Sequence, residues 1–273
     1  MKRTITFLWV LAAGGLGSST ATLAQGLPKT QPKLLTIIRE EVKTGRNAEH
    51  SKHEEGWPAA FEKAKSKDYY IAMTSLTGPN EAWYIIPSDS HAALGESMKQ
   101  QEKDPVLSAE QDRLTLKDAE YISSSRTIQA VAMPELTVGD FPDVNKVRYF
   151  EVTTFRMKPG HGMQFEEAAK AYASARKRAD AKAGYRVYQV IAGMPSPTYL
   201  VISSVEDYGK FDQMMASDMA TWKQATDDEK GALQKASSEG MISMESNRFR
   251  VDPHMSFVPK ETRDSDPEFW AAK

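Results

Sequence analysis

Two histidines and a glutamate lie close together near the start of the chain, at His50, His53 and Glu54. Imidazole nitrogens with a carboxylate nearby can bind a metal ion, ligate haem or transfer protons. Glu54 follows His50 by four residues, so both side chains can share one face of a helix. The strong helical zinc motif, H-E-x-x-H, spaces its histidines i, i+4, whereas these are i, i+3. We therefore predict His50, His53 and Glu54 as candidate catalytic residues and assign no metal; a solvated or hydrogen-bonded histidine pair is the alternative.

Aromatic residues are dense in the same part of the chain. Trp83 and Tyr84 are adjacent in an expected strand, so their side chains point to opposite faces of the sheet. Rings that border an incompletely filled interior would line an apolar pocket and offer hydroxyl and indole groups to a ligand. We predict as ligand-binding the residues Trp57, Tyr70, Trp83 and Tyr84. Ordinary core packing of these rings is the alternative.

Motifs for nucleotide-dependent and hydrolytic chemistry are absent from the sequence. It contains no G-x-G-x-x-G, no P-loop, no G-x-S-x-G and no H-E-x-x-H. It has no cysteine, which excludes disulfides and thiolate metal sites. The cofactor is therefore undetermined, and the sequence leaves open whether the protein is an enzyme.

The N-terminus has the three parts of a secretory signal peptide. A basic start, Met1-Lys2-Arg3, precedes an apolar run over residues 5–16 and a small-residue end at Ala24. The apolar run is shorter than the roughly 20 residues that span a bilayer. We expect cleavage after residue 24, a periplasmic or extracellular product, and no membrane contact after cleavage.

Charge is mixed along the 273 residues. Removal of Lys2 and Arg3 with the signal would change the formal net charge from −2 to −4. A mildly acidic, evenly mixed surface argues against nucleic acid as a partner, because proteins that bind nucleic acid carry clustered basic residues. The one dense basic cluster, Arg176, Lys177 and Arg178, is expected on a solvated helix face.

An internal repeat organises the chain. Residues 147–160 form an expected strand that ends in a Lys-Pro-Gly turn before an Ala-rich helix, and residues 34–45 are a weaker copy. Matched positions along the two copies are offset by 115 to 120 residues, and their order is kept. The matched pairs are Gly45 and Gly160, Tyr69 and Tyr185, Trp83 and Tyr199, and Ile122 and Ile242. The pattern indicates a duplication with small insertions in loops.

Each copy predicts the order β-α-β-β-α-β, which is the ferredoxin-like pattern of the α+β class. One face of such a sheet is bare and apolar, so we expect two tandem ferredoxin-like units packed sheet to sheet as an intramolecular α/β barrel. The expected divisions are a signal peptide at 1–24, a first unit at 33–133, a linker at 134–146, a second unit at 147–258 and a tail at 259–273. We expect the polar, Pro-interrupted tail to fray.

The second copy also carries a family resemblance. Residues 149–160, YFEVTTFRMKPG, with Phe165-Glu-Glu behind them, resemble the opening of NIPSNAP-type domains. More broadly they resemble the dimeric α/β barrel superfamily, which includes antibiotic-biosynthesis monooxygenases and haem-degrading enzymes. The first copy matches only at residues 42–45, where Thr44 replaces the proline. The resemblance implies a barrel of paired ferredoxin-like sheets, and it carries over no catalytic residue.

Comparison of the two copies separates the function hypotheses. In the second copy, Phe165 and Ala168 begin an apolar helix stripe; the equivalent positions in the first copy are His50 and His53. Our first hypothesis is an exported protein that binds a small apolar or aromatic ligand. The two histidines of the first copy favour a second hypothesis, an oxidative enzyme of cofactor-free or haem-linked monooxygenase type. A third is a module that self-associates into a homo-oligomer through exposed sheet edges.

Overall fold

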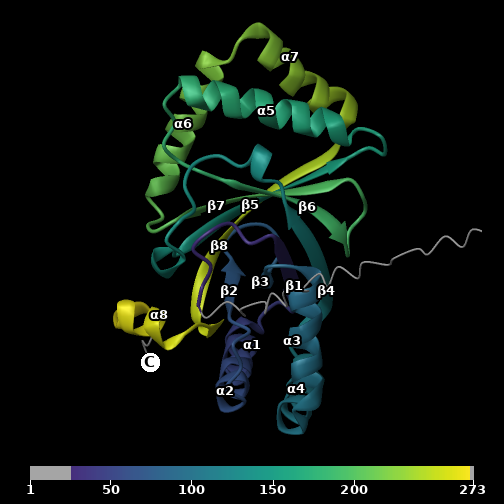
Figure 1. Cartoon of the computed structure of the whole chain (residues 1–273), viewed down its shortest axis with the longest axis vertical. Coiled ribbons are helices and arrows are strands. Elements are labelled where there is room, and N and C mark those ends of the chain that lie inside the picture. The colour runs from purple at the N-terminus through teal and green to yellow at the C-terminus, as the bar shows by residue number, and fades with distance from the viewer. Residues whose placement is uncertain (1–25, 271–273) are drawn as a thin grey trace, which may run out of the picture.

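Eight antiparallel strands form a closed barrel in the computed structural model, which describes residues 26–270 (Figure 1). The expected signal peptide lies outside the described residues. The strands are β1 Leu34–Val42, β2 Tyr70–Ser75, β3 Glu81–Ser88, β4 Ile122–Ala132, β5 Tyr149–Met157, β6 Arg186–Ala192, β7 Thr198–Val205 and β8 Met241–Phe257. The barrel confirms the α+β class and the antiparallel sheet that the sequence predicts.

The strand order around the barrel is β1-β3-β2-β8-β5-β7-β6-β4, and β4 closes it on β1. The four strands of each half of the chain are neighbours, and the halves join where β2 pairs with β8 and β4 with β6. Closure gives every strand a neighbour on both sides. Residues 122–128 of β4 and 241–247 of β8 nevertheless pair on one side only, so self-association through sheet edges, our third hypothesis, stays a prediction.

Helices cover the outside of the barrel in two groups (Figure 1). The first half supplies α1 Asn47–Glu54, α2 Gly56–Lys63, α3 His91–Lys103 and α4 Pro105–Asp118. The second half supplies α5 Gly162–Arg178, α6 Lys210–Gln224 and α7 Asp227–Lys235, followed by a π-turn at Ala236–Gly240. The two groups lie at opposite ends of the long axis of the view. Within residues 26–270, none of these helices has the length and apolar character that crossing a membrane requires.

Local sequence explains where the helices begin and break. Asp104 caps α4 by accepting hydrogen bonds from the backbone N–H groups of Val106 and Leu107, and Pro105 occupies the first turn. The first helix region breaks at Glu55, directly before Gly56-Trp57-Pro58. Pro58 lacks an N–H to continue the ladder from α1. The break leaves α1 as a short helix that packs its own face against the sheet.

Side chains fill the inside of the barrel. Trp83 and Phe249 meet at its centre with ring centroids 4.9 Å apart, and both are almost fully buried. Around them lie aliphatic side chains from both halves, which include Ile37, Ile128, Val152 and Leu200. The interior is therefore a packed core. Trp83, which we predicted as ligand-binding, packs into this core, where neighbouring side chains occupy the space.

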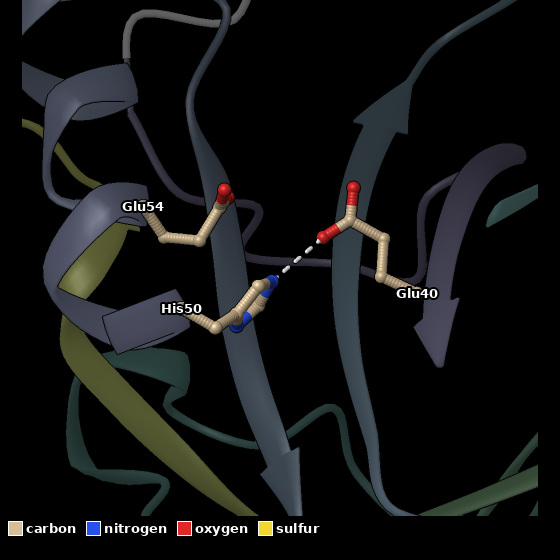
Figure 2. Close-up of side chains that lie close together, drawn as sticks. All are labelled: Glu40, His50 and Glu54. Atoms are coloured by element: carbon tan, nitrogen blue, oxygen red, sulfur yellow. Dashed lines mark hydrogen bonds and ion pairs between the residues drawn. The ribbon is translucent and has the colours of Figure 1, made fainter. Parts of the chain in front are cut away.

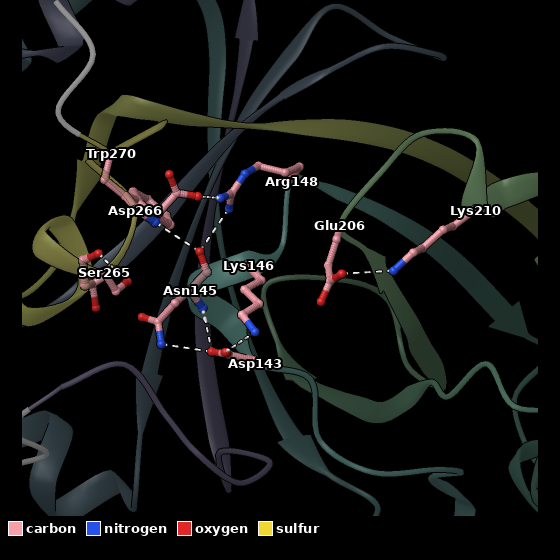
Figure 3. A network of polar contacts seen from close by, with 10 residues as sticks. Asp143, Asn145, Lys146, Arg148, Glu206, Lys210, Ser265, Asp266 and Trp270 are labelled. Carbon is pink, nitrogen blue, oxygen red and sulfur yellow. Dashed lines mark hydrogen bonds and ion pairs between the residues drawn. The ribbon is translucent and has the colours of Figure 1, made fainter. Parts of the chain in front are cut away.

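Residues 259–270 of the C-terminal tail dock on the linker, contrary to our expectation that the tail frays (Figure 3). They form two short helices, α8 Lys260–Ser265 and α9 Pro267–Trp270. Trp270 is buried, and its indole N–H donates to the carbonyl of Asn145 at 3.0 Å. Arg148 pairs with Asp266 and stacks 3.7 Å from the ring centroid of Phe269. Burial of an aromatic pair with a hydrogen-bonded indole explains why a largely polar segment is ordered.

The junction of the two halves depends on Gly193. Its φ is +86°, and a Cβ at this position would lie 2.1 Å from the carbonyl oxygen of Thr127 in β4. We expect Gly193→Ala to lower the free energy of unfolding by about 2 kcal/mol or more, measured by urea titration. The control is Gly160→Ala, which has φ +83° but no atom within 4 Å, and it should cost about 1 kcal/mol. Equal losses in the two variants would contradict a close contact at this junction.

Candidate functional site

A buried cluster of acids and histidines lies between the first-half helices and the sheet. We call this set the acid–histidine cluster; it comprises Glu40, His50, His53, Glu54 and Asp118. α1 supplies the two histidines and Glu54, because spacings of three and four residues place all three on the face toward the barrel. The sequence thus predicted three of its members correctly as neighbours.

Glu40 and Asp118 are the two members that sequence reasoning missed. Glu40 projects from β1, where it alternates with Ile38 and Val42 on the face that the helices cover. Asp118 is the last residue of α4 and is buried. A charged residue at an apolar position of a strand was the signal that could have found Glu40.

Each histidine of the cluster is paired with a carboxylate. His50 Nε2 lies 3.1 Å from Glu40 Oε2 (Figure 2). His53 Nε2 lies 3.3 Å from Asp118 Oδ1 and 3.0 Å from the carbonyl oxygen of Leu114. Glu54 lies between the two pairs and belongs to both groups of close donor atoms. The histidines are therefore held in place by hydrogen bonds, as the simpler alternative for them anticipated.

Glu54 and Asp118 each have one buried carboxyl oxygen, Oε1 and Oδ1 respectively, without a hydrogen-bond partner among residues 26–270. Glu54 is 2% exposed. Burial raises the pKa of Glu54 to about 10, with further increases from the charges of Glu40 and Asp118. The carboxyl group is consequently neutral at pH 7 in this environment.

Two predicted ligand-binding residues border this cluster. Tyr70 and Tyr84 are buried, and neither hydroxyl has a hydrogen-bond partner in the described residues. Burial, and then the charges of Glu54 and Glu40, hold the pKa of both phenols well above its usual range. Trp57, on α2, packs half-buried on the same side of the sheet.

Trp83 lies on the opposite face of the sheet, inside the barrel. Its indole N–H donates to Glu81 at 2.7 Å, and Arg39 lies over its ring. The structure therefore brings together Trp57, Tyr70 and Tyr84 but not Trp83. Within the acid–histidine cluster, Glu40, His50 and Glu54 are buried, whereas His53 is only partly buried and lines a surface pocket.

A cavity of about 400 Å³ lies in the second half of the chain, where the sequence predicted none. It separates α5 and α6 from the outer faces of β5–β8, and we call it the α5 cavity. Its apolar walls include Phe155, Met157, Phe165, Tyr172, Met214 and Met244. The small side chains of Ala168 and Ala169 leave space beneath α5. Such a volume and lining are typical of small-molecule sites.

The polar groups of the α5 cavity gather around Arg176. This residue is 3% exposed, and so its predicted position on a solvated helix face is wrong. Its guanidinium pairs with Asp218 at 2.8 Å, and the Tyr172 hydroxyl donates to the same Asp218 oxygen at 2.6 Å. Arg176 Nε and the Tyr185 hydroxyl are buried with no hydrogen-bond partner among the described residues. Burial raises the pKa of Tyr185 to about 12, so its hydroxyl keeps its proton.

Comparisons with known proteins give a fold and no family. No protein-family model matches the chain, and neither does any curated protein. A candidate monooxygenase from Fusobacterium nucleatum subsp. nucleatum is 10% identical, with TM-score 0.52 over 82% of this chain and 94% of its own. An anthrone oxidase-like protein is 14% identical, with TM-score 0.52 over 82% and 94%. A chlorite dismutase variant from Candidatus Nitrospira defluvii is 7% identical, with TM-score 0.49 over 86% and 96%.

The first two of these likenesses establish that the barrel architecture is shared with solved structures across most of both chains. Identities this low show the fold alone. The broad expectation of an α/β barrel is confirmed, whereas the narrower resemblance to NIPSNAP-type and antibiotic-biosynthesis monooxygenase domains is not.

Proposed function

We propose that this chain is an oxidative enzyme that takes a flat, largely apolar aromatic molecule into the α5 cavity and oxidises it with dioxygen. The observation that carries the proposal is an apolar cavity bordered by two buried donors that have no partner within residues 26–270, Arg176 Nε and the Tyr185 hydroxyl. A phenolic or keto oxygen of a ligand would give these donors the acceptor they lack. Similarity in fold to a candidate monooxygenase and an anthrone oxidase-like protein supports the choice of reaction.

The chemistry suits an electron-rich substrate with an activated CH₂ group beside a carbonyl or phenol. Asp218 receives both of its hydrogen bonds on Oδ1, which leaves Oδ2 to accept a proton from that carbon. Arg176 and Tyr185 stabilise the resulting oxyanion. The carbanion then reduces dioxygen, and the overall change is CH₂ + O₂ → C=O + H₂O. The apolar walls exclude water from the reacting carbon.

Our second hypothesis included a haem-linked enzyme, but the residues that line the α5 cavity do not suit haem. Neither histidine nor cysteine is among its described lining residues. Its one guanidinium, on Arg176, is already paired with Asp218 and is not free to neutralise a propionate. The reaction proposed above needs no haem.

Pocket blocking tests the proposal. Oxygen uptake is measured with an anthrone as substrate, and the quinone product is identified by mass spectrometry. We expect Ala169→Phe to reduce the rate about 100-fold, because the ring fills the substrate volume. Ala171→Phe lies on the same helix outside the cavity lining and should keep the activity. Wild-type protein that binds the anthrone without consuming oxygen would support a binding protein instead and overturn the enzyme.

Tyr185→Phe separates catalysis from folding. The change removes a buried hydroxyl without a partner, so the melting temperature should stay the same or rise. The turnover rate should fall about tenfold or more, because one oxyanion donor is lost. A variant as active as the wild type would remove Tyr185 from the site, and the outcome is read by oxygen uptake alongside thermal denaturation.

We also propose that the two halves, 33–133 and 147–258, are tandem ferredoxin-like units produced by duplication. Support comes from the strand order, β4-β1-β3-β2 in one half and β8-β5-β7-β6 in the other. Gly45 and Gly160 further match in φ, at +81° and +83°. We keep export through a signal peptide at 1–24 as a proposal, and N-terminal sequencing of the periplasmic fraction tests it.

A further inference from the structure

The acid–histidine cluster has no part in the reaction proposed for the α5 cavity, and its geometry suggests a different role. Glu40 reaches it from β1, while His50 and Glu54 reach it from α1 (Figure 2). All three residues are buried, and one donor atom of each lies within 4.8 Å of the others. His50 Nε2 and Glu40 Oε2 are already 3.1 Å apart. Donors bound to one ion at about 2.1 Å stand roughly 3–4 Å apart, so small side-chain shifts complete the arrangement.

An unpartnered oxygen provides a second, independent sign of a missing ligand. Glu54 is 2% exposed and extends toward Glu40 and His50, yet its Oε1 has no hydrogen-bond partner within residues 26–270 (Figure 2). Native proteins rarely leave a buried carboxyl oxygen unsatisfied unless an ion, a water or a function accounts for it.

The number of carboxyl groups in the acid–histidine cluster also favours a bound cation. Three carboxyl groups, from Glu40, Glu54 and Asp118, meet in one buried volume, and two imidazoles are the other donors. A divalent cation would compensate the negative charge that these groups acquire when they ionise to bind it.

We propose that Glu40, His50 and Glu54 form a binding site for a divalent first-row transition-metal ion such as Zn²⁺ or Mn²⁺. One imidazole nitrogen with carboxylate oxygens suits these ions better than Ca²⁺ or Mg²⁺, which take oxygen ligands almost exclusively. The His53–Asp118 pair borders the other side of Glu54 and holds that carboxyl in position. Because Glu40, His50 and Glu54 are buried, the ion fastens α1 to β1 and does not touch a substrate.

Metal binding to the full chain, stripped with EDTA and dialysed, tests the site. Isothermal titration calorimetry with ZnCl₂ and MnCl₂ should give one site per chain, and the ion should raise the melting temperature. Glu54→Gln keeps the side-chain volume but removes an anionic ligand, and we expect affinity to fall about 100-fold. His91→Gln, an exposed histidine outside the cluster, should leave binding unchanged.

Two results would overturn the proposed metal site. Wild-type protein that gives neither binding heat nor a melting shift with these ions overturns the site. Glu54→Gln that binds as tightly as the wild type places the ion elsewhere and overturns it too. If Glu54→Gln does not fold, Glu40→Gln and His50→Gln replace it, read by the visible spectrum of bound Co²⁺, which changes when a ligand is lost. Failure here leaves oxygen uptake at the α5 cavity unaffected.

Discussion

Glu54→Gln is expected to become more stable than the wild type as the pH rises, in metal-free protein. The folded state raises the pKa of Glu54 from an ordinary value of 4.5 to about 10, chiefly through burial. Between these two values the folded protein keeps a proton that the unfolded chain releases, so the stability of the wild type falls as pH increases. Glutamine keeps the shape and has no proton to lose. The difference in free energy of unfolding should shift by about 4 kcal/mol in favour of Glu54→Gln between pH 6 and pH 9.

Urea titrations of both proteins at each pH, with EDTA present, measure this difference. The other titrating groups that face Glu54 are Glu40, Asp118, His50, His53, Tyr70 and Tyr84, and they are common to both proteins. Glu49→Gln, at an exposed position of the same helix, should track the wild type at every pH. A constant gap between wild type and Glu54→Gln would mean that this carboxyl titrates normally.

Phe249→Ala is expected to lower the free energy of unfolding by about 4 kcal/mol. The side chain is fully buried at the centre of the barrel against Trp83. It also lies in β8 between Ser75 of the first half and Phe150 of the second, where the two halves are joined. Truncation removes the transfer free energy of the ring and leaves a cavity that strands from both halves must line.

The loss is measured by urea denaturation, with Ile242→Ala as the control. Ile242 lies on the same strand but is 47% exposed, and its truncation should cost about 0.5 kcal/mol. A loss below about 1 kcal/mol for Phe249→Ala would show that the barrel interior is not the packed core that holds the halves together.

Much of the architecture could be predicted from short-range signals. The Lys-Pro-Gly turn before an Ala-rich stretch, and the repeated order of apolar runs, predicted where strands and helices alternate. The strand pairs that close the barrel could not be predicted in this way. The pairs β2–β8 and β4–β6 join segments far apart in sequence, and only the summed geometry of eight strands brings them together.

The candidate sites could likewise be predicted only where local spacing determines them. Helical spacing was enough to group His50 with Glu54. It could not supply Glu40 or Asp118, because these come from β1 and α4. The α5 cavity was missed because Phe165 begins an apolar stripe that indicates simple packing. The clue was Arg176, four residues beyond Tyr172 and therefore on the face that turns toward the sheet.

A crystal structure of the protein with a bound anthrone tests the central claim most directly, since it shows whether the α5 cavity is the substrate site. The account predicts ligand density between α5 and the outer face of β5–β8, with the ligand oxygen in hydrogen-bond contact with Arg176 or Tyr185. Density for the ligand at the barrel interior or among the first-half helices, with the α5 cavity empty, would contradict it.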